Sequence, residues 1–306
     1  MTDTKTGIVR KCIGGFYYVE AADAVYECRA RGIFRRQGLT PVAGDRVRIS
    51  CQITEEGPKG TLEEVLERRN VLVRPPVANL DILGIVAAIT EPEPSTQIMD
   101  RQIALAERKG IEPAVIINKA DLGQTDWLEA IYRKAGLPCF VVSADTGEGL
   151  GELREYLKGK VCAFTGNSGV GKSSLLNALE PRLRLETGEI SKKLGRGRHT
   201  TRAAVLYPLE GGGYLVDTPG FSSLTADLER SEWIPKEELA GYFREFVPYF
   251  GQCRFSSCMH VREPHCAVRQ AVEEGKIAPS RYESYRVMYE EIKDRKEWEQ
   301  AGKADK

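Results

Sequence analysis

The run AFTGNSGVGKSSLLNAL, residues 163–179, constrains the fold of this chain more than any other. Its Gly166, Gly171, Lys172 and Ser173 match the phosphate-binding loop pattern, in which four variable residues separate the first glycine from Gly-Lys-Ser. An apolar run precedes the loop and a helical pattern follows it, as the motif requires. The sequence therefore predicts a strand, a loop that cradles phosphates and a helix, which together form the core of an α/β domain.

A motif that reads guanine lies upstream of this loop. Asn118-Lys119-Ala120-Asp121 follows the apolar strand pattern AVIIN. The Asp121 carboxylate can accept the N1–H and 2-amino hydrogens of guanine, and adenine offers no such pair of donors, so GTP is expected over ATP. Asn118 is expected to support the loop and contact the base edge, with the Lys119 stem lying across the ring. Ser143-Ala144 also follows a strand pattern, and its Ala144 N–H is expected to face the guanine O6.

A third motif, Asp217-Thr218-Pro219-Gly220, closes the strand pattern YLVDT downstream of the loop. There the Gly220 N–H is expected to sense the γ-phosphate, while Lys172 reaches the β- and γ-phosphates. The predicted magnesium ligands are Ser173, Thr201 and Asp217. The predicted GTP contacts are Asn118, Lys119, Ala120, Asp121, Ser143, Ala144, Gly166, Asn167, Ser168, Gly169, Val170, Gly171, Lys172, Ser173, Ser174 and Gly220.

The order of these motifs is unusual, because an ordinary GTPase carries the guanine motif after the phosphate loop. Here the chain reads NKAD, SA, phosphate loop, threonine and DTPG. That is the ordinary series cut after DTPG, with its second half moved to the front. Strand pairing is spatial, so the sheet survives if the old ends are joined, here by a helix at 150–157 and Lys158-Gly159-Lys160. We therefore expect a circularly permuted P-loop GTPase domain whose DTPG switch leads directly into the C-terminal zone.

The 306 residues divide into three zones. Residues 1–69 hold five short strand patterns, which favour a small β-barrel of the OB-fold type and leave an SH3-like barrel open. Residues 70–224 alternate apolar strand patterns with helical patterns, which predicts a mostly parallel sheet covered by helices, with ligands at the carboxyl ends of the strands. Residues 225–306 have a mostly helical, charged pattern, with helical apolar faces at 239–246 and 282–292.

Three cysteines and a histidine cluster in this last zone. Cys253, Cys258, His260 and Cys266 offer the Cys₃His set of a tetrahedral structural zinc site, in which no position remains for a catalytic water. His265 is a competing ligand, but it adjoins Cys266 and would strain the loop, so His260 is favoured. Unligated cysteines are the alternative. The other five cysteines, scattered among apolar residues, are expected to be buried thiols of a reducing cytosol.

Two stretches carry local positive charge, although the net formal charge of the chain is zero. Contact with RNA phosphates is one interpretation and a solvated face is the other. The two basic groups are Arg29, Arg31, Arg35 and Arg36 on the barrel, and Lys192, Lys193, Arg196, Arg198 and Arg202 in the loop before the DTPG strand.

The glutamine that orients the attacking water in many small GTPases is missing after DTPG, where Phe221 stands. A phenyl ring cannot position water. His199, beside the magnesium threonine Thr201, is a candidate for that catalytic role. The alternative is that His199 contacts RNA phosphate or packs in its loop.

The motif order NKxD, SA, GNSGVGKSS, HTT and DTPGF resembles that of circularly permuted GTPases. With a barrel in front and the Cys₃His zone behind, nearly the whole chain resembles the ribosome small-subunit-dependent GTPases of the RsgA type. The resemblance implies a GTP hydrolase that binds the 30S subunit and its 16S rRNA, is stimulated by that subunit and acts late in its maturation. It also points to His199 as the group that orients water. We expect GTP and GDP as ligands, one structural Zn²⁺, Mg²⁺ with GTP, and a monomeric protein.

Two other functions use some of the same motifs. A GTP-gated RNA-binding scaffold, in which hydrolysis is incidental, stays open as the alternative, and an ATP-dependent kinase is disfavoured by NKAD. The sequence contains no run of about 18 apolar residues, so no membrane span is expected. The N-terminal residues MTDTKTGIVRK lack the apolar core of a signal peptide, so a cytoplasmic location is expected.

Overall fold

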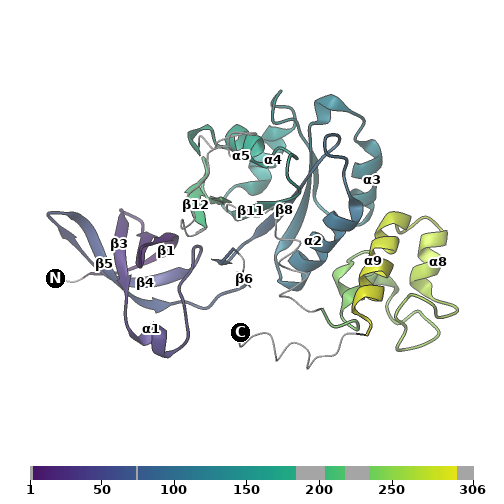
Figure 1. The fold of residues 1–306 in the computed structure, drawn as a ribbon, viewed down its shortest axis with the longest axis horizontal. Coiled ribbons are helices and arrows are strands. Elements are labelled where there is room, and N and C mark those ends of the chain that lie inside the picture. Colours follow the sequence, from purple (N-terminus) through teal and green to yellow (C-terminus); the bar gives the residue numbers. More distant parts are fainter. Residues whose placement is uncertain (1–2, 74, 184–203, 218–233, 295–306) are drawn as a thin grey trace.

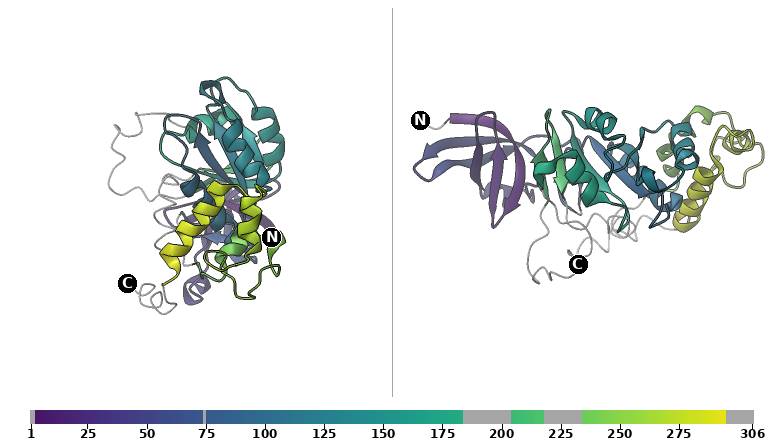
Figure 2. Two further views of the ribbon diagram at one scale, coloured as in Figure 1. Left: turned by 90° about the vertical axis from the view of Figure 1, so that its right-hand side faces the viewer. Right: turned by 90° about the horizontal axis from the view of Figure 1, so that it is seen from above.

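The computed structural model describes residues 3–73, 75–183, 204–217 and 234–294. The chain forms three parts arranged in a row (Figures 1 and 2). A β-barrel lies at one end, a helix-covered sheet lies in the middle, and a small helical part lies at the other end. This is the three-part fold expected from the sequence.

The barrel consists of five strands: β1 (Asp3–Ile13), β2 (Phe16–Glu20), β3 (Val25–Ala30), β4 (Arg46–Thr54) and β5 (Gly57–Val65). They pair in the order β1-β2-β3-β5-β4, and β4 returns to β1, so the barrel is closed. The β3–β5 pair is parallel and the others are antiparallel. The short helix α1 (Ile33–Arg36) lies between β3 and β4. This Greek-key order confirms the OB-type barrel.

The central sheet contains β8 (Ile82–Ala88), β9 (Glu112–Asn118), β10 (Cys139–Val141), β11 (Val161–Thr165), β12 (Val205–Pro208) and β13 (Tyr214–Asp217). Their order is β10-β9-β8-β11-β13-β12, and only β12 runs antiparallel to its neighbour in this set. Every residue of β8 and β11 is buried. Both strands are continuous apolar runs because helices cover both faces of a parallel sheet.

Two pairs of helices cover the two faces of this sheet. Leucines of α4 (Leu150–Leu157) and α5 (Lys172–Leu179) pack in one core, with alternate residues of β8 such as Val86. On the other face, α2 (Thr96–Arg108) and α3 (Asp126–Lys134) pack against the intervening residues, such as Ile85. Short 3₁₀ turns follow β9, at Ala120–Leu122, and α5, at Pro181–Leu183.

The circular permutation is visible in this sheet. Its central strand β11, which leads into the phosphate loop, is entered by the chain only after β8, β9 and β10. The join predicted from the sequence is present: α4 ends at Leu157, and Lys158-Gly159-Lys160 connects it to β11. A two-stranded sheet of β6 (Val71–Leu72) and β7 (Val77–Ala78) lies in the connection from the barrel to β8.

The barrel and the central sheet are joined by hydrogen bonds. Lys11 of β1 pairs with Val205 of β12, so eleven strands form one continuous sheet. The Arg10 side chain adds a bond from Nε to the Leu206 carbonyl oxygen at 3.1 Å. The barrel is thus fixed to the strand that follows Thr201 in the sequence.

The C-terminal part contains α8 (Ala267–Glu273) and α9 (Pro279–Ile292). Tyr285 of α9 is fully buried, as the helical pattern at 282–292 predicts. The prediction of a single helical face at 239–246 is wrong, because this segment forms only a short 3₁₀ turn at Leu239–Tyr242 and is followed by a second one at Val247–Tyr249. Its apolar residues are nevertheless buried in one core with Tyr285. Gly241 and Pro248 disfavour a continuous α-helix here.

Candidate functional site

The phosphate loop connects β11 to α5 and depends on its glycines. Gly166, Gly169 and Gly171 have φ angles of 144°, 87° and 89°, which residues with a side chain rarely adopt. A Cβ atom at Gly166 would lie 2.1 Å from the Val86 carbonyl oxygen, and one at Gly171 would lie 2.4 Å from the Asn118 Nδ2 atom. Gly166 and Gly171 therefore require glycine for both conformation and space, and Gly169 requires it for conformation.

The Lys172 side chain folds back over this loop. Its Nζ atom donates to the carbonyl oxygens of Gly166 at 2.7 Å and Asn167 at 2.6 Å. Burial lowers the pKa of the Lys172 ammonium to about 8, because a charged group is less stable away from water. An incoming phosphate would supply the counter-charge that this ammonium lacks.

The predicted phosphate and magnesium residues on α5 lie at its first turn. The helix begins at Lys172, so Ser173 and Ser174 are at its N-terminal end, where free backbone N–H groups and the helix dipole favour anions. Ser173 is half-buried and Ser174 is exposed. Loop and helix terminus together form a surface for phosphate groups.

Asn118 connects the guanine motif to two other loops. The side chain is buried; its Nδ2 atom donates to the Val170 carbonyl oxygen at 2.9 Å, and its Oδ1 atom accepts from the Ala144 N–H at 3.1 Å. The structure thus brings together the NKAD, SA and phosphate-loop motifs, which lie far apart in the sequence. Since Ala144 N–H is held by Asn118, contact with a guanine O6 would have to share or replace that bond.

Lys119 and Asp121 lie on the solvent side of this junction. Lys119 has a left-handed backbone, with φ of 62°, and its ammonium binds the carbonyl oxygens of Thr90, at 3.4 Å, and Glu91. Asp121 is exposed at the start of the 3₁₀ turn, so a ligand can reach its carboxylate. Ser143 is buried and its Oγ atom accepts from the Thr146 N–H at 3.1 Å, which holds the SA loop closed.

The segment Thr90–Ser95, between β8 and α2, was not identified in the sequence as part of this site. It supplies the carbonyl groups that bind Lys119, and its Pro92 Cδ atom would lie 3.5 Å from a Cβ atom added at Gly169. The prolines and glutamates of TEPEPS, directly after a strand, are the signal that marks a fixed loop at the ligand edge of the sheet.

Several predicted residues lie outside the described residues. These are His199, Thr201, Gly220 and the basic residues Lys192, Lys193, Arg196, Arg198 and Arg202. Asp217 is the last residue of β13, at the carboxyl end of the strand beside β11.

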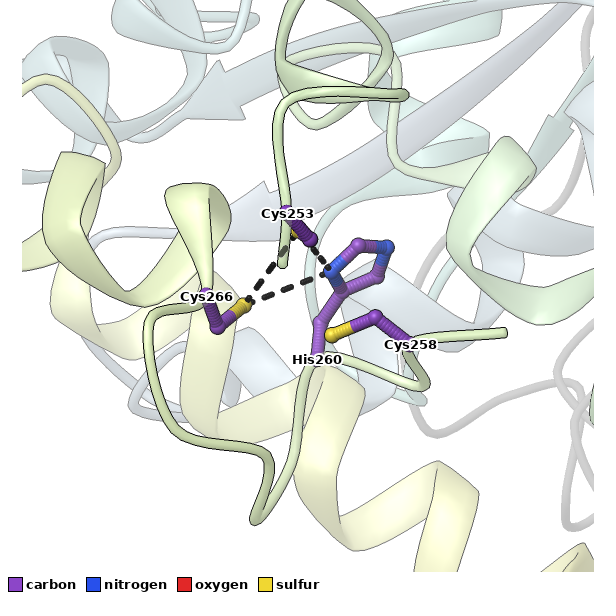
Figure 3. A group of neighbouring side chains, drawn as sticks. All are labelled: Cys253, Cys258, His260 and Cys266. Atoms are coloured by element: carbon purple, nitrogen blue, oxygen red, sulfur yellow. Dashed lines mark hydrogen bonds between the residues drawn. The ribbon is translucent and has the colours of Figure 1, made fainter. Parts of the chain in front are cut away.

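The Cys₃His cluster is assembled as expected from the sequence (Figure 3). One ligand atom from each of Cys253, Cys258, His260 and Cys266 lies within 4.8 Å of the others. The His260 Nδ1 atom is 3.6 Å from Cys253 Sγ and 3.4 Å from Cys266 Sγ, and these two sulfur atoms are 4.0 Å apart. Four ligands at about 2.0–2.3 Å from one tetrahedral zinc would lie roughly 3.5–3.8 Å apart. The donor set and spacing fit a metal ion.

Neighbouring groups hold this cluster in shape. The Glu263 carboxylate accepts from the backbone N–H groups of Met259, Val261 and Arg262 at 3.0–3.1 Å. The Tyr282 hydroxyl donates to the His260 carbonyl oxygen at 2.8 Å. Burial lowers the pKa of His260, which favours the neutral imidazole that binds metals.

His265, the competing ligand, is exposed and lies outside the cluster. The structure therefore selects His260, as the sequence analysis favoured.

Two of the four basic residues of the barrel, Arg29 and Arg31, line a hollow of about 720 Å³ together with Gly14 and Phe16. The Arg29 guanidinium lies over the Phe16 ring at 4.9 Å, and Arg31, which also lines the hollow, pairs with Glu63 at 2.6 Å. Arg36 is exposed, and Arg35 lies beside it in α1. The glutamate partner offsets part of the positive charge of this surface.

No helix in the described parts of the chain has the length and apolar character needed to cross a membrane.

Comparison with known proteins places the chain in a family. The family model described as RsgA GTPase matches residues 65–227, and the model of the RsgA N-terminal domain matches residues 6–58. The chain is 49% identical to the small ribosomal subunit biogenesis GTPase RsgA of Caldanaerobacter subterraneus subsp. tengcongensis over 292 residues. The aligned region covers 94% of this chain and 96% of that protein. It is 45% identical to the protein of the same description from Streptococcus pneumoniae, over 95% of this chain and 96% of that protein.

Solved structures agree with this assignment. YjeQ from Thermotoga maritima has a TM-score of 0.81 and 42% identity, covering 96% of this chain and 100% of that one. YloQ, described as a circularly permuted GTPase, has a TM-score of 0.78 and 36% identity, covering 96% of each chain. The shared motifs, sheet order and three-part architecture have one consistent explanation: this chain belongs to the RsgA family of circularly permuted GTPases.

Proposed function

We propose that this protein is a GTP hydrolase that binds the small ribosomal subunit and acts late in its maturation, with hydrolysis stimulated by the subunit. The observation that carries the GTP site is the position of Asn118, which holds the SA loop and the phosphate loop together. The role in the biogenesis of the small subunit comes from the relatives, whose descriptions name it.

In this proposal the guanine base binds beside NKAD. The exposed Asp121 carboxylate accepts the N1–H and 2-amino hydrogens, and the Lys119 stem covers one face of the ring. The phosphates lie in the loop Gly166–Ser174, where Lys172 turns from its carbonyl partners to the β- and γ-phosphates. The Gly220 N–H responds to the γ-phosphate.

Magnesium would be held by Ser173, Thr201 and Asp217, where it would neutralise charge on the phosphates. His199, two residues before Thr201, would orient the attacking water, since Phe221 replaces the usual glutamine. The Cys₃His cluster would hold one structural Zn²⁺, because four protein ligands leave no place for a catalytic water.

The ribosomal partner would be bound partly through 16S rRNA. The barrel arginines Arg29, Arg31, Arg35 and Arg36 and the basic loop Lys192–Arg198 would contact its phosphates. We assign the barrel to residues 1–69, the GTPase domain to 70–224 and the zinc domain to 225–306. A monomeric, cytoplasmic protein is consistent with this function.

The test is the rate of GTP hydrolysis with and without purified 30S subunits. Stimulation of tenfold or more is expected, because ordering a catalytic loop can change phosphoryl transfer by orders of magnitude. A GTP-gated scaffold would instead bind 30S subunits in a nucleotide-dependent way with no increase in turnover. That result would replace the hydrolase proposal.

A further inference from the structure

Helix α2 lies beside the C-terminal part (Figure 1), and residues on another of its faces line a small cavity next to the phosphate loop. Ile98 and Gln102 line a small cavity together with Gly166 and Asn167 of the phosphate loop. Asp100 lies about half a helical turn away and binds the C-terminal part. One helix therefore borders both the phosphate loop and the C-terminal part.

The contact between α2 and the C-terminal part is largely polar. Arg281 of α9 is fully buried and donates to Asp100 at 2.8 Å and to Glu245 at 2.7 and 3.0 Å. Arg244 pairs with Glu107 at the C-terminal end of α2 at 2.6 Å. In the described residues, only Ala104 of α2 joins the buried apolar cluster of the C-terminal part. Polar contacts of this kind are typical of domains that move relative to each other.

This helix also carries polar groups that lack partners. Six buried side-chain nitrogen or oxygen atoms have no hydrogen-bond partner in the part of the chain that the structure describes, and five of them belong to α2 or α9. They are Asp100 Oδ2, both amide atoms of Gln102, and the hydroxyl groups of Ser280 and Ser284. Buried polar groups are normally bonded, so each of these atoms has the capacity for a further hydrogen bond.

Possible hydrogen-bond partners for Asp100 and Gln102 lie near each of these two faces of α2. The Ser284 hydroxyl is near the Asp100 carboxyl and opposes the rise in its pKa that burial causes, yet the two do not meet hydrogen-bond geometry. On the other face, Gly166 and Asn167 border the cavity that Gln102 lines, and their carbonyl oxygens are occupied by the Lys172 ammonium.

We propose that α2 is a two-position element that reports the state of the phosphate loop to the C-terminal part. When nucleotide draws Lys172 toward the phosphates, the carbonyl oxygens of Gly166 and Asn167 lose a donor, and the Gln102 amide takes its place. The accompanying shift of α2 brings Asp100 Oδ2 into bonding distance of Ser284 and tightens the contact with α9. This inference rests on the nucleotide binding of the proposed function, and it adds a route by which that binding is transmitted.

The test is hydrogen–deuterium exchange of the α9 amides in full-length, zinc-loaded protein. Samples contain no nucleotide, GDP or a non-hydrolysable GTP analogue, and a fluorescent analogue reports binding in the same samples. The GTP analogue should slow exchange in α9 at least threefold. The variant Gln102→Leu, which keeps the approximate size of the side chain and removes its polar atoms, should lose this response at a saturating concentration of the analogue, where the fluorescent signal shows that nucleotide is bound. Arg286→Gln, on the exposed face of α9, is the matched control and should keep the response.

Equal exchange in α9 with and without bound analogue would overturn the inference and leave the proposed function intact, whereas absence of nucleotide binding would remove both. A full response in Gln102→Leu would also overturn it. If Gln102→Leu does not fold, Ser284→Ala decides in its place, because it removes the predicted Asp100 partner without touching the phosphate loop. Retention of the full response in Ser284→Ala would then refute the coupling.

Discussion

The pair of substitutions Gly171→Ala and Gly169→Ala tests whether Asn118 couples the guanine motif to the phosphate loop. Both glycines have the same left-handed backbone, with φ angles of 89° and 87°. A methyl group at 171 would lie 2.4 Å from the Asn118 Nδ2 atom, whereas one at 169 has only Pro92 Cδ within 4 Å, at 3.5 Å. The two variants therefore share backbone strain and differ in the displacement of Asn118.

The expected difference follows from the bonds that Asn118 makes. An alanine in the left-handed region costs roughly 1–2 kcal/mol at either position. At 171 the displaced Asn118 also loses its bonds to the Val170 carbonyl oxygen and the Ala144 N–H. At about 1 kcal/mol for each bond, that adds about 2 kcal/mol. GTP should then bind about thirtyfold more weakly to Gly171→Ala than to Gly169→Ala.

The assay is the dissociation constant of a fluorescent GTP analogue, with urea unfolding of each variant as a check that both are folded. The same pair is measured in an Asn118→Ala background, where the side chain that clashes is gone. The thirtyfold difference should shrink there to less than about threefold, because contacting residues show non-additive effects. Equal affinities of the two variants in the Asn118 protein, or an undiminished difference in the Asn118→Ala protein, would refute the coupling.

Three further predictions address the base, the lysine and the metal. Asp121→Asn should lose GTP affinity and gain affinity for xanthosine triphosphate, because the substitution replaces an acceptor with a donor; nucleotide competition measures this, and unchanged GTP affinity would remove Asp121 from the base site. The pKa of Lys172 is lowered to about 8 in the free protein, and bound phosphates should raise it, so binding takes up a proton above that pH. GTP affinity should thus fall about tenfold from pH 7 to 9, and a flat profile would contradict this; Lys172→Arg, whose charge does not titrate in that range, should lose the dependence. Purified protein should contain one zinc per chain by metal analysis, and chelation should expose residues 234–294 to protease; continued protection of the stripped protein would argue against a structural role.

The local parts of the fold were predictable because their signals are local. The apolar runs at 82–88 and 161–165 are buried on both faces of the sheet, and the glycine-lysine motif between strand and helix fixes the phosphate loop. The segment 239–246 shows the limit of such reasoning. Its apolar spacing fits one helical face, but Gly241 disfavours a helix and the burial of Phe243 and Phe246 requires only short turns.

Contacts between distant residues could not be predicted in the same way. Arg281 and Asp100 are 181 residues apart, and nothing in the sequence near either one distinguishes a buried ion pair from two solvated charges. The same holds for the single pair between Lys11 and Val205 that fixes the barrel to the central sheet. His260 could be favoured over His265 from loop strain, but only the folded chain brings its Nδ1 atom to the cysteine sulfurs.

The circular permutation explains why these distant contacts matter for a nucleotide-dependent protein. Because the phosphate loop strand β11 lies in the centre of the sheet, the motifs that follow it occupy one side and the guanine motif occupies the other. On the side of β13 and β12, the edge strand β12 pairs with the barrel. On the side of the guanine motif, helix α2 binds the C-terminal part through Asp100. The sequence predicts that the C-terminal zone responds to nucleotide, through DTPG. The structure also joins the barrel to β12 and the C-terminal part to α2, so we expect nucleotide state to bias both terminal parts.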